Sequence, residues 1–372
     1  MAEPLRVAHI VGKMVGGGVE ASILNYNGHI DSSRVQFDFL VDSDSTYVPR
    51  EEIEASGGRI FEIPPYQQQL PYQHELIRLF EKEKWRIVHS HVNTMSVFSL
   101  RAAKVAGVPI RIAHCHATMG KGEGRRNALK LVLRCFANLY PTDRVACSRY
   151  AGEWLFGRKT PFDLLPNAIV IEHFRFSQEK RNNVRASWGV GSDCCVVGHV
   201  GRMESTKNQS FLIDAFNILH AEHPDAKLVL VGNGKMRSEL EFKVRSLGLE
   251  GSVLFLGQVD AISELYHGFD VFAFPSLYEG FGMALLEAQI SGLQCVVSNR
   301  ISSESIVSDN CRILSLEAGC AAWAQSVADA YIVSLDRSTG VHWDNLARYD
   351  IAVAADRLTK YYLNLNARQD ER

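Results

Sequence analysis

Short apolar runs alternate along the chain with longer stretches in which apolar residues recur at helical spacing. In the first half, the β-rich runs are residues 5–11, 37–41, 59–63, 87–90 and 110–114. In the second half, they are residues 195–200, 227–231, 252–256, 271–274 and 295–298. A turn and a helical pattern follow each run, which is typical of βαβ units with parallel strands. The alternation therefore predicts two doubly wound α/β domains.

The stretch between the two halves predicts a domain boundary. Residues 164–174 and the polar residues 177–183 interrupt the alternation, and we interpret both segments as linker. Near the end of the chain, residues 350–363 have the spacing of a helix. We expect an N-terminal domain of residues 1–175 completed by residues 350–372, and a C-terminal domain of residues 176–349.

The composition excludes several classes of protein. With 372 residues, 46% of them hydrophobic, the chain can bury two cores and is not disordered. Its formal net charge of -2 gives no reason to expect a nucleic-acid partner. The eight cysteines form no CxxC pair, so we expect reduced thiols in the cytoplasm and no zinc site. No run approaches the roughly 20 apolar residues that cross a bilayer, so we expect at most a peripheral protein at the inner face of the membrane.

Glycines follow the first predicted strand and open a helix. Gly16, Gly17 and Gly18 precede Glu20, and their bare N–H groups at a helix start could approach a phosphate. The GxGxxG spacing of a dinucleotide site is absent, which argues against a nicotinamide-dependent oxidoreductase. A simple tight turn explains the same glycines equally well.

Two cations follow the first strand of the second half. Gly201 and Arg202 come directly after this strand, and Lys207 lies at the start of the next helix. Ligands of open parallel sheets bind at the carboxyl ends of the strands, so these side chains could neutralise a diphosphate leaving group without a metal. The alternative is a pair of solvated surface charges.

Two glutamates lie around the turn after residues 271–274. Glu279 is in the turn and Glu287 lies one to two helical turns further on, so both carboxylates can reach one ligand. Carboxylates accept hydrogen bonds from adjacent hydroxyls, which suits a sugar or a ribose. The glycines of this turn, including Gly282, allow the backbone to approach the ligand. Stabilisation by the helix dipole alone would explain Glu287, but not the whole cluster.

Four histidines lie near strand ends in the first half: His89, His91, His114 and His116. We place the two members of each pair on opposite faces, so that only His91 and His116 need to face a cleft. No Asp or Cys at ligand spacing accompanies them, so we predict polar contacts and no metal. A structural role is the alternative for each histidine.

The stretch 121–140 resembles a basic amphipathic helix. Arg125 and Arg126 are among its five cations, and leucines, Val132 and Phe136 lie between them. Its apolar face packs on the sheet, or it contacts an anionic membrane surface or a lipid-linked acceptor.

Together these residues resemble retaining glycosyltransferase family 4, of the GT-B fold, and especially its bacterial exopolysaccharide and capsule branch. The resemblance covers nearly the whole chain, and its most specific motif is the pair Glu279 and Glu287 with seven residues between them. It implies two Rossmann-like domains that face each other across a cleft, with the C-terminal helix crossing back to the first. It also implies metal-independent transfer from a nucleoside-diphosphate sugar, with UDP the commonest, to a glycan or lipid-linked acceptor, and no cofactor.

The resemblance implies a role for each matching residue. Arg202 and Lys207 would bind the donor diphosphate, Glu287 the ribose, and His116 the transferred sugar. The remaining implied donor-side residues are Gly17, Gly18, Gly201, Gly232, Val259, Glu279, Phe281 and Gly282. His91, Arg125 and Arg126 would belong to the acceptor side.

One segment departs from the family pattern. Many members have Pro-Glu and a glycine-containing turn after the second glutamate, whereas this chain reads Ser302-Ser303-Glu304-Ser305-Ile306. We therefore infer no donor sugar from it. A catalytically inactive sugar-nucleotide-binding partner or sensor would keep the same fold and is the alternative function.

Overall fold

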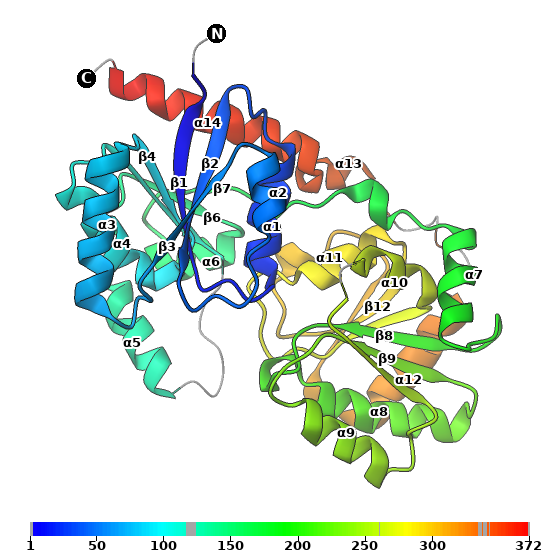
Figure 1. Cartoon of the computed structure of the whole chain (residues 1–372). Helices are drawn as coiled ribbons and strands as arrows, with labels where there is room; N and C mark the ends of the chain where they lie inside the picture. Colours follow the sequence, from blue (N-terminus) through cyan, green and yellow to red (C-terminus); the bar gives the residue numbers. More distant parts are fainter. Residues whose placement is uncertain are drawn as a thin grey trace. The chain divides into compact units, whose positions relative to one another are not determined.

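The computed structural model describes residues 3–116, 124–259, 261–333, 337, 341 and 343–370, with the backbone alone at 124–126, 344–345 and 370. The described residues form two compact units (Figure 1). Unit 1 comprises residues 3–116, 124–170 and 347–370, and unit 2 comprises the described residues of 171–346.

Unit 1 contains a seven-stranded parallel sheet with the order β3-β2-β1-β4-β5-β6-β7. Its strands are β1 (Leu5–Gly12), β2 (Val35–Asp42), β3 (Arg59–Ile63), β4 (Ile87–Ser90), β5 (Ile110–Cys115), β6 (Asp143–Ala146) and β7 (Asp163–Leu164). Its longer helices are α1 (Gly18–His29), α3 (Gln69–Glu83), α4 (Ser96–Val105), α5 (Gly124–Arg134), α6 (Arg149–Phe156) and α14 (Ile351–Asp370), and α2 (Arg50–Ala55) is short. The order reverses between β1 and β4, where ligands of such sheets bind.

The last helix of the chain completes the core of the first unit. One face of α14 buries Ile351, Ala355, Leu358 and Tyr362 in the same apolar cluster as the strands of unit 1. The helix packs beside α1 (Figure 1). The isolated bridge between Ile169 and Asp350 joins its start to the end of the first segment. The predicted terminal helix is therefore present, and it belongs to unit 1.

Unit 2 repeats this plan with a six-stranded parallel sheet in the order β10-β9-β8-β11-β12-β13. Its strands are β8 (Val196–Val200), β9 (Lys227–Val231), β10 (Val253–Gly257), β11 (Val271–Phe274), β12 (Gln294–Ser298) and β13 (Cys311–Leu314). Its helices include α7 (Gln178–Ser187), α8 (Gln209–Glu222), α9 (Arg237–Ser246), α10 (Ile262–Gly268), α11 (Met283–Ile290) and α12 (Gly319–Val333). Here the order reverses between β8 and β11.

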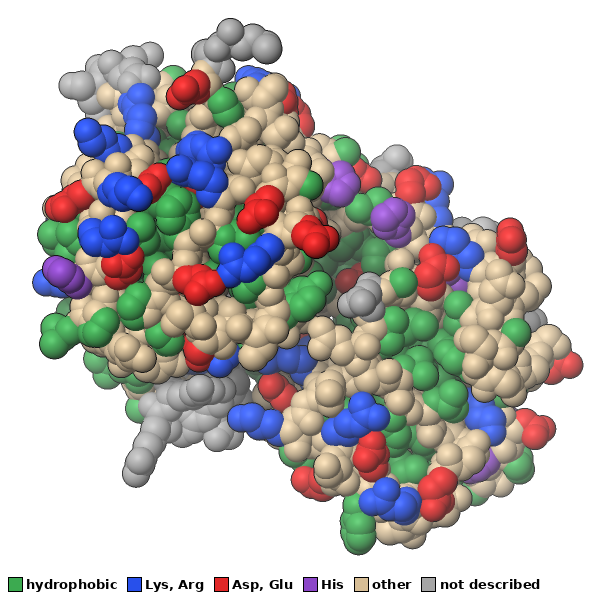
Figure 2. Space-filling model, viewed as in Figure 1, with side chains coloured by type: hydrophobic (Ala, Val, Ile, Leu, Met, Phe, Trp, Pro, Cys, Tyr) green, Lys and Arg blue, Asp and Glu red, His purple; other side chains and the backbone are tan. Residues whose placement is uncertain are grey.

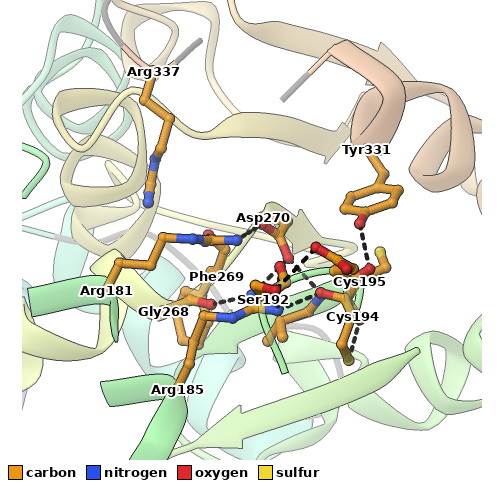
Figure 3. A network of polar contacts seen from close by, with 12 residues as sticks. Arg181, Arg185, Ser192, Cys194, Cys195, Gly268, Phe269, Asp270, Tyr331 and Arg337 are labelled. Atoms are coloured by element: carbon orange, nitrogen blue, oxygen red, sulfur yellow. Dashed lines mark hydrogen bonds and ion pairs between the residues drawn. The ribbon is translucent and has the colours of Figure 1, made fainter. Parts of the chain in front are cut away.

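The segment 177–183, which we interpreted as linker, was assigned wrongly. It begins helix α7, whose Ser177 side chain accepts a hydrogen bond from the Lys180 amide as the N-cap. The helix buries Arg185, which forms an ion pair with Asp270 at 3.0 Å (Figure 3). Asp270 also accepts hydrogen bonds from Arg181 and from the Val196 amide at the start of β8. Charge pairing, rather than an apolar stripe, therefore ties α7 to the sheet.

The ten strands that the pattern predicted are all present, with ends that differ by two residues at most. The pattern missed β6, β7 and β13, which are short and lie toward one edge of each sheet. On the face of unit 1 seen in Figure 2, Lys and Arg side chains are interspersed with Asp and Glu. In the part of the chain that is described, we find no helix both long and apolar enough to cross a membrane.

Candidate active site

The carboxyl ends of β8 and β11 bring together Lys207 and Glu279, two of the predicted donor-side residues of unit 2. The turn after β8 carries Gly201 and Arg202, and the 3-10 helix Ser205–Lys207 follows it. The Leu277 amide donates to the Thr206 carbonyl at 2.9 Å, which joins this turn to the loop after β11. Residues from two strand ends thus meet where the strand order reverses.

Lys207 and Glu279 form an ion pair at this edge of the sheet. Lys207 Nζ donates to Glu279 Oε1 at 2.6 Å, and the two side chains are only 20% and 10% exposed. Lys207 Nζ also lies 5.4 Å from the ring centroid of Phe274. A compact charge held beside a carboxylate can turn toward an arriving phosphate, while the carboxylate becomes available to hydroxyl groups.

Arg202 does not lie in the same environment as Lys207. Its side chain is 63% exposed and forms an ion pair with Glu204 at 3.1 Å. The two cations that the sequence placed at one strand end therefore have different partners. An exposed arginine can reorient at little cost, because exposed ion pairs contribute about 0–1 kcal/mol.

Backbone packing explains two of the predicted glycines. Gly232 has a φ of 121°, and a Cβ there would lie 2.3 Å from the Gly201 carbonyl oxygen. The backbones after β8 and β9 consequently touch, and only glycine allows this approach. Gly282 caps α11 with a φ of 78°, a left-handed conformation that also favours glycine.

The other predicted donor-side residues flank these turns. Phe281 is buried next to Gly282, and its carbonyl accepts a hydrogen bond from the Ser305 hydroxyl. Ser305 belongs to the segment that departs from the family pattern, so this segment supports the turn from behind. Val259 follows β10 and is half-buried.

Glu287 lies in α11 beside a tyrosine that the sequence did not single out. Tyr266, on α10, donates from its hydroxyl to Glu287 Oε2 at 2.7 Å. Desolvation raises the pKa of Glu287 to about 7, although the hydrogen bond from Tyr266 lowers it. One carboxylate oxygen is thus fixed by Tyr266, and a pair of hydroxyls could bind the other.

His199, in β8, is a second residue to which the sequence pattern assigned no role. Its Nδ1 lies 2.9 Å from the Ala273 carbonyl oxygen, which can only accept, so Nδ1 carries the proton. Its Nε2 is buried, has no hydrogen-bond partner among the described residues, and lies 3.5 Å from the site of a Cβ on Gly201. Burial lowers the pKa of His199 to about 4, so the ring is neutral.

In unit 1, the glycine turn before α1 is already occupied by a carboxylate. Glu20 Oε2 accepts from the amides of Gly17 at 2.7 Å and Val15 at 2.9 Å. Gly18 is exposed at the first position of the helix, and a Cβ there would meet no atom within 4 Å. A phosphate would therefore meet the Gly18 end of the turn, while Glu20 holds the Gly17 amide.

Five buried histidines of unit 1 form two rows of hydrogen-bonded rings. In the first row, His9 Nδ1 lies 2.9 Å from His91 Nε2, and His91 Nδ1 lies 2.8 Å from His116 Nε2. In the second row, the Tyr362 hydroxyl lies 2.6 Å from His89 Nδ1, and His89 Nε2 lies 3.1 Å from His114 Nδ1. These six side chains line a cavity of ≈ 10 Å³.

The prediction that each histidine pair spans opposite faces is wrong. Residues two apart along a strand point to the same face, and the rings of His89 and His91 stack with centroids 4.2 Å apart. The rings of His114 and His116 are 3.8 Å apart. His9, from β1, joins the same face, and its position near a strand end was the signal that would have found it.

Two trios of these histidines bring ring nitrogens within 4.8 Å of one another, as a metal site would require: His9, His89 and His91, and His91, His114 and His116. Burial lowers the pKa of all five rings, to about 3 for His9 and about 4 for His116. All five are therefore neutral at pH 7.

The predicted basic helix is present as α5, but the side chains of Arg125 and Arg126 lie outside the described residues. The helix buries Leu133 and contacts the 3-10 helix Asn93–Met95 of unit 1. Five other apolar side chains of α5 and the following turn are 46–58% exposed, and we call them the α5 patch: Leu129, Leu131, Val132, Phe136 and Leu139.

Known proteins resemble this chain along most of its length. A family model described as glycosyl transferases group 1 matches residues 180–329, which include every donor-side residue of unit 2. EpsF of Bacillus subtilis (strain 168), named as a glycosyltransferase, is 35% identical over 339 residues, which are 87% of this chain and 87% of EpsF. The chain belongs to the group 1 glycosyltransferases.

This group 1 glycosyltransferase also resembles an enzyme named for capsule synthesis and a solved structure. CapH of Staphylococcus aureus, named as a capsular polysaccharide biosynthesis glycosyltransferase, is 24% identical over 97% of this chain and 99% of CapH. HepE of Anabaena, solved with UDP and glucose, has the same fold, with a TM-score of 0.81 and 18% identity over 96% of this chain and 99% of HepE. The predicted family 4 membership and GT-B fold are thus confirmed.

Proposed function

We propose that this enzyme transfers a sugar from a UDP-sugar to a hydroxyl group of a glycan or lipid-linked acceptor in polysaccharide biosynthesis, with retention at the anomeric carbon. The observation that carries the proposal is the pair of Lys207 and Glu279 at the switch point of the second sheet. A cation after β8, a carboxylate in the loop after β11 and a second carboxylate, Glu287, in α11 suit a diphosphate joined to two sugars.

Each donor-side residue then has a role that its surroundings support. Lys207 leaves Glu279 and binds the diphosphate, joined by Arg202, whose exposed side chain can turn to it. Glu279 accepts from hydroxyls of the transferred sugar, and the amides of Phe281 and Gly282 at the start of α11 hold phosphate oxygens. Glu287 binds the ribose. From unit 1, we propose that Gly18 contacts the diphosphate and His116 the sugar.

The chemical step that we propose depends on charge at the leaving group. As the glycosidic bond breaks, negative charge grows on the β-phosphate, and Lys207 and Arg202 stabilise it more in the transition state than in the ground state. The departing phosphate then takes the proton of the acceptor hydroxyl. The reaction steps proposed here require no metal ion.

Two relatives support the choice of donor and acceptor. HepE was solved with UDP and glucose and also with UDP-glucose. An Escherichia coli relative, 30% identical over 60% of this chain, is named UDP-Gal:alpha-D-GlcNAc-diphosphoundecaprenol alpha-1,3-galactosyltransferase. A lipid-linked acceptor would also explain the exposed α5 patch, which could lie in an anionic membrane surface.

A donor screen tests the proposal. Wild-type enzyme is incubated with each common nucleoside-diphosphate sugar and with lipid-linked acceptors, and nucleotide release and product are followed. We expect UDP release with at least one donor, unchanged by a chelator, and a fall of about 10²- to 10³-fold in kcat for Lys207→Ala. Lys360→Ala, on the exposed face of α14, is the control. Donor binding without release in any acceptor extract would instead favour the inactive binding partner.

A further inference from the structure

The first row of imidazoles ends at His116, the residue proposed to contact the transferred sugar. The rings of His9 and His91 are nearly coplanar, with an interplanar angle of 13°, and their nearest nitrogens are 2.9 Å apart. The nearest nitrogens of His91 and His116 are 2.8 Å apart, with the two rings tilted by 33°. These are hydrogen-bond distances between edges of neighbouring rings. The three side chains are 1%, 4% and 5% exposed, so water does not compete for these bonds.

Ring geometry favours hydrogen bonding over metal coordination here. A zinc ion would require ring lone pairs that converge on one point about 2.0–2.1 Å away. The rings of the two rows are instead stacked, with angles of 28° between His89 and His91 and 30° between His114 and His116. Lone pairs lie in the plane of each ring, so those of stacked rings run side by side and do not converge.

A row of neutral imidazoles can point its protons in only two directions. Each ring has one N–H donor and one lone-pair acceptor, so the state of one ring fixes that of its neighbours. Either every ring carries its proton on Nδ1, or every ring carries it on Nε2. The groups at the two ends of the row decide between these states.

The end groups favour protons on Nδ1. His9 Nε2 has no hydrogen-bond partner and lies in an apolar environment, with the ring of Phe37 4.0 Å away. A buried N–H without an acceptor is costly, so this atom is better left as a lone pair. At the other end, Asn167 Oδ1 accepts from Ser22 Oγ at 3.2 Å, and the Asn167 side chain raises the pKa of His116. His116 Nδ1 is likewise buried without a hydrogen-bond partner among the described residues, but the Asn167 side chain beside it offers an acceptor for an N–H.

We propose that His9 and His91 are positioning residues that hold His116 neutral with its proton on Nδ1, so that His116 has no free lone pair and is not a general base. This inference rests on the proposed contact between His116 and the sugar. His91 occupies the Nε2 atom of His116, so this ring has no free lone pair for the acceptor proton. The row therefore leaves proton removal to the departing phosphate.

The direct test is nitrogen NMR of the histidine rings in the ligand-free enzyme at pH 7, with His116 assigned from His116→Gln. We expect the shifts of one neutral tautomer for His116, protonated at Nδ1. In His9→Phe, the head of the row is lost, and His116 becomes a mixture of tautomers. His9→Asn restores the single tautomer, because its amide N–H stands where Nδ1–H was. A proton on Nε2 in the wild type, or a spectrum of His116 unchanged by His9→Phe, overturns the proposal.

Kinetics provide the second readout. We expect His9→Phe to lower kcat by about two- to tenfold and to leave the donor KM within about twofold. The lower limit corresponds to an even mixture of the two tautomers, and the upper limit to the loss of the net contribution of one hydrogen bond. His9→Asn recovers the rate. Tyr362→Phe is the matched control, because it removes a hydroxyl group from the second row at a residue as buried as His9. Its spectrum of His116 and its kcat stay at the wild-type values, and an equal loss in this variant would indicate a merely structural role.

Metal analysis tests the alternative that the histidines of the two rows bind a metal ion. The purified enzyme is analysed for bound metals and titrated with zinc alone, and we expect less than about a tenth of an equivalent, because the stacked rings offer no converging lone pairs. One tightly bound metal per chain would overturn the row of N–H bonds. The spectra need no substrate, so an enzyme without turnover would refute the proposed function and leave the tautomer assignment to be decided on its own.

Discussion

At the scale of single residues, the donor-side cluster followed from the sequence, but the partners of its members did not. The motif predicts Lys207, Glu279 and Glu287, and the structure brings the first two into one ion pair. Tyr266 lies on another helix, 21 positions before Glu287. Nothing in the spacing of an ordinary tyrosine indicates that it donates to a particular carboxylate, because that contact depends on how α10 packs against α11.

The burial of Glu287 should make donor binding depend on pH. Desolvation raises the pKa of Glu287 to about 7, and ribose hydroxyls donate best to the ionised carboxylate. The affinity for UDP should therefore rise with pH through about 7 and level off above it. Among the described residues, the hydrogen bond to this carboxylate comes from Tyr266.

Calorimetric titration of UDP from pH 5.5 to 8.5 checks this expectation. Tyr266→Phe removes the hydrogen bond that lowers the pKa of Glu287, so the rise in affinity should move to higher pH. Glu287→Gln should bind weakly with no such rise. The idea fails if Tyr266→Phe leaves the midpoint unchanged or moves it to lower pH.

Gly232 offers a second prediction at this scale. Gly232→Ala places a Cβ 2.3 Å from the Gly201 carbonyl oxygen in a left-handed backbone, so the turns after β8 and β9 must separate. We expect the free energy of unfolding to fall by about 1–3 kcal/mol in urea denaturation, and UDP affinity to fall with it. Gly251→Ala, where a Cβ meets no atom within 4 Å, is the control and should change neither.

At the scale of elements, helix α7 shows where hydrophobic periodicity fails. The segment is polar, and its one buried residue, Arg185, is held by Asp270 and by backbone carbonyls. Hydrophobic periodicity predicts a linker for such a stretch, because it depends on apolar side chains alone. It gives no information about an ion pair with a residue 85 positions later. The strands were found because buried parallel strands are nearly continuous apolar runs.

Asp270→Asn tests how far this pairing stabilises unit 2. The change leaves the buried Arg185 without its counter-charge, and we expect a loss of about 3–5 kcal/mol in the free energy of unfolding. Asp356→Asn removes the partner of an exposed ion pair on α14 and should cost less than about 1 kcal/mol. Equal losses in the two variants would mean that Asp270 contributes no more than a surface charge.

The α5 patch carries a prediction about membranes. Leu129→Glu with Val132→Glu removes two exposed apolar side chains from one face of α5, and we expect at least about tenfold weaker binding to phosphatidylglycerol vesicles. Leu70→Glu, on α3, is equally apolar and 85% exposed, and should leave binding unchanged. Sedimentation with vesicles measures both variants. Wild-type protein that binds neither anionic nor phosphatidylcholine vesicles would rule out a membrane role for the patch.

At the scale of the molecule, the two units should differ in their response to acid. Burial lowers the pKa of five histidines in unit 1 and of His199 and His267 in unit 2. A histidine whose folded pKa lies below the unfolded value of about 6.5 stabilises the fold above that pH and loses this contribution as the pH falls. Each contributes at most about 1.4 kcal/mol per pH unit.

We therefore expect unit 1 to lose stability faster than unit 2 between pH 6.5 and 4.5. Hydrogen exchange of amides in β1 and β4 against those in β8 and β9, measured across this range, compares the two sheets within one molecule. Faster loss of protection in unit 2 would contradict the neutral state of the histidine rows.

The place of α14 has a consequence for how the chain is made. The described residues of unit 2 all come from the stretch 171–346, whereas the core of unit 1 includes Ile351, Leu358 and Tyr362 from the last helix. During synthesis, unit 1 can complete its core only after α14 has been made, although its sheet is made first. Unit 2 can fold before α14 is made. A premature stop codon before residue 350 would therefore spare the later domain and leave the earlier one with an exposed apolar groove for chaperones to cover.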